Sequence, residues 1–152
     1  MASEGGCVVG RAENSVAEAL RRAHAVLLED LRRLDEATHP ASGEGLAELR
    51  ARLDVTQEHI TEHFRFEEQN GYMHAVRARE PRLERAIHQL AEEHRQLARS
   101  LEALIERARD TTSLDDRFRD EVREWVERVR QHEARENDIV QDAFNLDIGA
   151  ED

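Results

Sequence analysis

Two short segments of the chain pair a histidine with a glutamate four residues later. They are His63 with Glu67 in "HFRFE" and His132 with Glu136 in "HEARE". Residues four apart lie on one face of a helix, so each pair can present an imidazole and a carboxylate to the same ligand. Neutral imidazole and carboxylate are ligands that iron accepts in proteins. Either pair alone is a weak signal, because a histidine and a glutamate one turn apart can also form a salt bridge.

Both pairs occupy places where a helix normally carries apolar residues. From Leu46 to about Met73, apolar residues recur at steps of three and four as far as Ile60, and the first pair takes the next two places. Three further segments show the same periodicity. The ionisable residues on the four stripes are His24 on the first, His63 and Glu67 on the second, His94 on the third, and His132 and Glu136 on the fourth.

Breaks in the sequence delimit four helices. The first helix is predicted to begin near residue 15, and "THPASGEG" at 38–45 separates it from the second. "NGYM" with Pro81 separates the second from the third, and "DTTSLDD" supplies a turn and a cap before the fourth. Short connections between amphipathic helices predict an all-α protein, an antiparallel up-down-up-down four-helix bundle.

The length of 152 residues fits one domain. We assign residues 15–147 to the bundle, residues 1–14 to a flexible N-terminal tail rich in glycine, and residues 148–152 to an acidic C-terminal tail. The net charge of -12 argues against nucleic acid or an anionic membrane as a partner. No apolar run resembles a signal peptide or a membrane span, and a single cysteine allows no intrachain disulfide. These features predict a cytoplasmic protein.

The ionisable residues of the four stripes are expected to share one layer. The offsets on the two sides of each turn are similar: about 14 and 18 residues for His24 and His63, about 11 and 14 for Glu67 and His94, and about 16 and 19 for His94 and His132. At roughly 1.5 Å per residue these offsets differ by a turn or so. A buried ion without a partner costs several kcal/mol, whereas two divalent metal ions would balance the buried carboxylates. The second and fourth helices run parallel, so their glutamates can bridge two metals from opposite sides.

Simpler explanations account for single residues better than for the whole layer. A hydrogen-bonded core histidine would explain His24 alone, and a salt-bridge network would explain one helix. Interruption of four helices at one level favours metal. His59, one turn before the second helix's pair, is predicted to be either an outer partner or an extra ligand. The remaining polar candidates, predicted at the surface, are His39, Glu68, His74 and His88.

The order His, HxxxE, His, HxxxE over four helices resembles the hemerythrin-like (HHE cation-binding) proteins. "HFRFEEQNGYM", "LAEEHRQL" and "QHEARENDIV" look like their second, third and fourth helices, and the resemblance covers roughly residues 15–147. It implies a non-haem centre of two iron ions joined by an oxo or hydroxo bridge. The implied ligands are His24 and His63 on one iron, His94 and His132 on the other, and Glu67 and Glu136 bridging both.

The chain departs from the oxygen-carrying hemerythrins at two places. Those proteins have HxxxH on the third helix, where the residues four away from His94 are Leu90 and Ala98, and HxxxxD on the fourth, where this chain has HxxxE. The pattern is closer to a sub-group with four histidines and two glutamates, whose members are associated with iron or oxygen sensing or with peroxide decomposition. One fewer histidine implies an additional open position on a metal.

Three functions are compatible with these residues. The favoured one is a di-iron protein that binds or reacts with dioxygen or peroxide, with peroxidase-like or catalase-like turnover left open. The second is a non-catalytic oxygen or iron carrier or sensor. The third is a metal-free helical interaction module. An open coordination position favours the first. No separate general acid or base stands out, although His59, Glu62 or Tyr72 could serve.

Overall fold

The computed structural model describes residues 4–39, 45–69 and 72–144, with side chains from residue 18 onward. Apart from range ends and short connections such as 111–115, these residues are helical, and no strand occurs among them, which confirms the predicted all-α class. The elements are α1 (Glu4–Ala37), α2 (Leu46–Gln69), α3 (Tyr72–Arg79), the short 3-10 helix η2 (Pro81–Leu83), α4 (Glu84–Asp110) and α5 (Asp116–Phe144).

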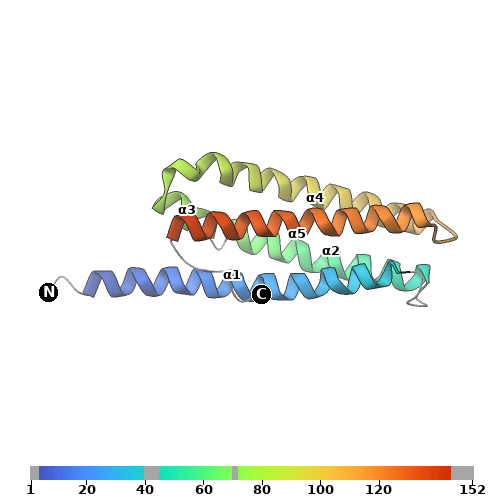
Figure 1. Ribbon diagram of the computed structural model, residues 1–152, viewed down its shortest axis with the longest axis horizontal. Coiled ribbons are helices and arrows are strands. Elements are labelled where there is room, and N and C mark those ends of the chain that lie inside the picture. Colours follow the sequence, from blue (N-terminus) through green and yellow to red (C-terminus); the bar gives the residue numbers. More distant parts are fainter. Residues whose placement is uncertain (1–3, 40–44, 70–71, 145–152) are drawn as a thin grey trace.

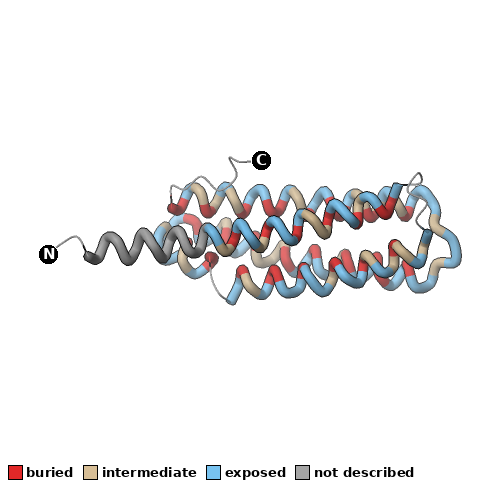
Figure 2. Tube along the Cα trace, turned by 90° about the horizontal axis from the view of Figure 1, so that it is seen from below, coloured by how far each residue is buried: buried red, intermediate tan, exposed pale blue. Residues whose placement is uncertain are grey.

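The four long helices lie side by side along the long axis of the molecule (Figure 1). Helix α1 packs against α2 and α5, and α4 packs against the same two helices from the other side. The short α3 covers one end of the bundle, where it contacts α5 and α2. Buried positions line the inner sides of the helices and exposed positions the outer sides (Figure 2), as expected for amphipathic helices around one core.

Among the residues whose side chains are described, the core consists of two apolar clusters. The larger cluster includes Leu31, Leu53, Leu101 and Trp125, and fills the half of the bundle near the connections from α1 to α2 and from α4 to α5. The smaller cluster includes Leu20, Val76, Ile87, Val140 and Phe144, and lies under α3 and η2. Because the two clusters share no residue, whatever lies between them along the bundle interrupts the apolar core.

Polar contacts hold the helix ends at the α4–α5 connection. The backbone N–H of Phe118 donates a hydrogen bond to Asp115 Oδ1 at 2.8 Å, which caps α5 and confirms the turn and cap predicted there. Arg50 of α2 donates from Nε to the carbonyl oxygen of Ala108 and from Nη2 to that of Thr111, both at 2.5 Å. These bonds satisfy carbonyl groups at the end of α4 that have no helical partner.

Element boundaries differ from the prediction in three places. Helix α1 begins at Glu4 and not near residue 15. No proline interrupts the segment, and its glycines weaken the helix by about 1 kcal/mol each relative to alanine without removing a backbone hydrogen bond. Helix α2 ends at Gln69 instead of Met73, and α3 follows as a separate helix. Helix α5 ends at Phe144, and the predicted acidic tail lies outside the described residues. Among the described residues, no helix is both long and apolar enough to cross a membrane.

Candidate metal centre

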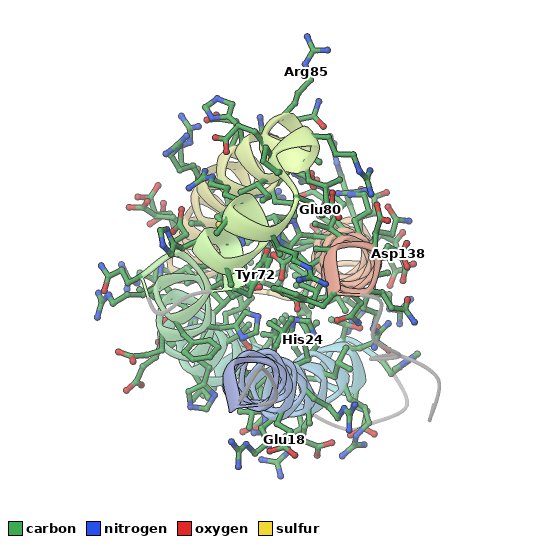
Figure 3. The ribbon with its side chains drawn as sticks, turned by 90° about the vertical axis from the view of Figure 1, so that its left-hand side faces the viewer. Glu18, His24, Tyr72, Glu80, Arg85 and Asp138 are labelled. Atoms are coloured by element: carbon green, nitrogen blue, oxygen red, sulfur yellow. The ribbon has the colours of Figure 1, made fainter. Side chains whose placement is uncertain are left out.

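The six predicted ligands come together between the two apolar clusters. Helix α1 contributes one histidine, α4 one histidine, and α2 and α5 a histidine and a glutamate each. All six are buried, and both glutamates have no exposed surface. Viewed along the bundle, His24 lies on the inner side of α1, whereas Glu18 of the same helix points outward (Figure 3). The residues of this layer that were predicted are His24, His63, Glu67, His94, His132 and Glu136.

One half of the layer is built around the histidines of α1 and α2. The rings of His24 and His63 lie 5.3 Å apart between centroids. His63 Nε2 is 2.9 Å from Glu67 Oε1. His24 Nε2 is 3.9 Å from Glu67 Oε2 and 3.6 Å from Glu136 Oε2. The Nε2 atoms of both histidines therefore point at the same carboxylates.

The other half is built around the histidines of α4 and α5. The rings of His94 and His132 lie 4.8 Å apart between centroids. His94 Nε2 is 2.9 Å from Glu136 Oε1 and 3.6 Å from Glu67 Oε1, and His132 Nε2 contacts Glu136 Oε1 as well. Glu67 and Glu136 therefore approach histidines of both halves, as a bridging pair would.

A third buried carboxylate, Glu133, belongs to the layer and was not predicted. It is 3% exposed, and its Oε2 lies 2.5 Å from His24 Nε2. Its Oε1 lies 3.2 Å from His63 Nε2. A signal for it exists in the sequence, because Glu133 follows Val126 by seven residues and Val129 by four. The apolar face of a core helix is wider than one row of positions, and the prediction covered only the row through His132 and Glu136.

These side chains form two groups that could each hold a metal ion. The larger group consists of His24, His63, Glu67, Glu133 and Glu136, and the smaller of His94, His132 and Glu136. Within each group the ligand atoms lie within 4.8 Å of one another. The two groups share Glu136, so two metals held here would be neighbours with a common carboxylate.

The donor atoms fit a metal better than they fit a hydrogen-bonded core. Within the part of the chain that the structure describes, the buried atoms without a hydrogen-bond partner include His24 Nε2, His132 Nε2, both carboxylate oxygens of Glu67 and one of Glu136. Native proteins rarely leave buried polar atoms unpaired, and each such atom costs about 1–3 kcal/mol. His24 Nε2 has Glu133 at ion-pair distance, yet without the geometry of a hydrogen bond. Atoms that converge in this way could serve as ligands of a common ion.

Burial and the mutual contacts shift the titration of the layer. Burial opposes protonation of His24, but its contacts with Glu133, Glu136 and Glu67 outweigh burial and raise its pKa to about 12. The same balance raises the pKa of His63 to about 10 and that of His132 to about 9. Burial lowers the pKa of His94. Without metal, the carboxylates therefore hold protons on three imidazoles.

The carboxylates shift in different directions. Burial raises the pKa of Glu136, and the charges of Glu67 and Glu133 raise it further. Burial opposes ionisation of Glu133 too, but its contacts with His24 and His63 outweigh burial and lower its pKa. Carboxylates packed this closely need positive charge among them, which protons supply in the metal-free layer and divalent ions would supply in a loaded one.

Groups outside the layer contact two of its histidines. His132 Nδ1 lies 3.2 Å from Glu93 Oε1, and Glu93 is paired with Arg135. His94 Nδ1 lies 3.7 Å from Glu68 Oε2, and the His94 ring stacks on Phe64 with centroids 4.0 Å apart. Histidines that bind metals usually donate their second ring N–H to a carboxylate or carbonyl, so the Glu93 contact presents His132 Nε2 to the layer.

The other histidines lie away from the layer. His59 is exposed, and its Nδ1 lies 2.5 Å from Asp30 Oδ2 of α1. The structure does not bring it to the ligand groups, so the alternative of an extra ligand finds no support. Exposed positions are also occupied by His39, Glu68, His74 and His88, as predicted.

The fold and the layer together define a helical bundle with a buried histidine–carboxylate site able to hold metal ions. The family model described as the Hemerythrin HHE cation binding domain matches residues 15–144, and the chain belongs to this family. The family resemblance predicted from the sequence is thereby confirmed. Comparison with curated proteins and with solved structures gave no match.

Proposed function

We propose that the chain is a non-haem di-iron protein that binds or reacts with dioxygen or peroxide inside an antiparallel up-down-up-down bundle. The observation that carries this proposal is the pair of buried ligand groups joined by Glu136. Membership of the HHE cation-binding family supports a metal. The short connections between long helices support the bundle topology.

The proposed ligands divide between two irons. His24 and His63 would hold one iron and His94 and His132 the other, with Glu67 and Glu136 shared. Two irons in one site would supply the electrons for dioxygen or peroxide chemistry. The protein's part is to fix the imidazoles, to balance the metal charge with buried carboxylates, and to keep bulk water out with the apolar clusters on either side.

The proposal is tested by metal analysis. After anaerobic loading with iron, the protein should retain about two iron ions per chain, the stoichiometry of a di-iron bundle. Absorption spectra recorded with dioxygen and with hydrogen peroxide should then differ from the spectrum of the anaerobic protein. Less than half a metal per chain in every preparation would show that the layer is a hydrogen-bonded core and that the proposal is wrong.

A non-catalytic carrier or sensor is the second candidate, and the position of the layer favours it. The layer lies between the two apolar clusters, so metal or ligand bound there would act on the packing of both. A sensor should bind dioxygen or metal stoichiometrically and show a large change in stability without turnover. An enzyme should decompose many equivalents of hydrogen peroxide per chain, which an oxygen electrode measures.

A further inference from the structure

We propose that the two metal positions are unequal, with Glu133 making the His24/His63 position the tighter one. The His94/His132 position is then the weaker one and the one that accepts an exogenous ligand. This inference rests on the proposed function, since it requires that two metals bind. It adds an order of filling and a location for ligand binding.

The donor sets differ in number and in charge. The group around His24 and His63 contains three carboxylates, whereas the group around His94 and His132 contains one within the same distance limit. Glu67 also lies near the second group, with its Oε1 3.6 Å from His94 Nε2. If Glu67 is counted in both groups, the first group still has one more carboxylate than the second, which is Glu133. Each additional carboxylate adds a ligand atom and a negative charge next to a cation, and both strengthen binding.

The inequality can be traced to one pair of positions. Helices α2 and α5 each carry a histidine with a glutamate four residues later, and in each the residue after the histidine faces the other half of the layer. On α5 this residue is Glu133, which contacts His24 and His63. On α2 it is Phe64, whose ring lies 4.0 Å from that of His94 and 5.8 Å from that of His132. A carboxylate thus faces one pair of histidines, and a benzene ring faces the other.

The ring of Phe64 cannot coordinate, and α4 has no substitute. Neither Leu90 nor Ala98, four residues on either side of His94, has a donor atom. The second metal therefore has fewer protein ligands and keeps positions for small molecules.

Titration of the metal-free protein with Co²⁺ tests the inequality, because the visible spectrum of Co²⁺ reports coordination. The wild type should bind two ions in two steps. Loss of an outer partner already weakens a metal site about 10–100-fold, so a missing ligand should separate the steps by at least that factor. Azide should change the spectrum only after the second equivalent has been added.

Variants assign the two steps to the two positions. Glu133→Gln should weaken the first step at least tenfold and leave the second unchanged. His94→Ala should abolish the second step and preserve the first. Glu127→Gln, an exposed glutamate on the same helix, is the matched control and should bind as the wild type does. Circular dichroism verifies that each variant remains helical.

The outcomes separate the inference from the function on which it rests. If the wild type binds no metal, the proposed function fails. If two ions bind with equal affinity, or if azide responds fully at one equivalent, the unequal positions are refuted while the dimetal centre stands. If His94→Ala loses the first binding step, the assignment of the two steps to the two metal positions is refuted. His94→Ala gives this test even if Glu133→Gln does not fold.

Discussion

Metal binding at neutral pH should release about three protons per chain. In the metal-free protein the pKa values of His24, His63 and His132 are raised to about 12, about 10 and about 9. All three imidazoles therefore carry a proton at pH 7. A histidine binds a metal through a neutral ring nitrogen, so each of the three must lose its proton when metal enters. His94 contributes none, because burial lowers its pKa.

The proton count sets the pH dependence of affinity. Each proton released makes the overall binding constant about tenfold larger per pH unit, so three protons give about a thousandfold increase per unit. This slope should hold between about pH 7 and pH 9 and flatten above, as His132 and then His63 lose their protons without metal. Acid should release the metal for the same reason.

Calorimetry measures the proton count directly. Zn²⁺ is titrated into metal-free protein in two buffers with different enthalpies of protonation, and the difference in heat divided by the difference in buffer enthalpy gives the protons released. His88→Ala, an exposed histidine on α4, is the control and should release as many protons as the wild type. Release of fewer than one proton would mean that the imidazoles are neutral in the metal-free layer and that the carboxylates do not hold protons on them.

Three further changes should have measurable effects. The metal-free protein should melt lower than the loaded protein. It should lose further stability as the pH rises above about 6.5, most steeply up to about pH 9 and less steeply from there to about pH 12, because a histidine with a raised pKa stabilises the fold fully only below its unfolded pKa and no longer does so above its folded pKa; an unchanged melt after verified metal removal contradicts this. His59→Ala should retain all its iron by elemental analysis and lose less than about 1 kcal/mol, because it breaks only an exposed pair with Asp30. Tyr72→Phe removes a buried hydroxyl that has no hydrogen-bond partner among the described residues, so the metal-free variant should be more stable in urea by about 1 kcal/mol, and a destabilised variant would reveal a partner for that hydroxyl.

Periodicity was sufficient to find the six expected positions of the layer. His63 and Glu67 continue the row of Leu53 and Ile60, and all four residues are buried in the structure. A row of side chains at steps of three and four must face one side of a helix, whatever the chemistry of its members. The polar positions were therefore as predictable as the leucines around them. Whether they bind metal is decided by the donor atoms and not by the periodicity.

The row along α5 could not be followed to its end with the same certainty. The predicted row passes through Ile139, but Ile139 is only partly buried and Val140 takes its place in the core. A helix of 3.6 residues per turn drifts by about 20° per heptad relative to a seven-residue repeat. Over a helix of 29 residues this drift moves the buried face by about one position. Glu133 and Val140 lie seven residues apart on the shifted row.

The packing of the four helices against one another explains why the asymmetry of the layer was invisible in the sequence. Read as text, "HFRFE" and "HEARE" offer the same ligand pair, and the residue after each histidine looks like a neighbour off the row. In the bundle that residue turns toward the opposite pair of histidines, where Phe64 stacks on His94 and Glu133 reaches His24. Which helix faces which pair is a property of how four helices pack, and no single helix contains it. The donor set of each metal position therefore depends on a residue from a helix that supplies neither of the two histidines at that position.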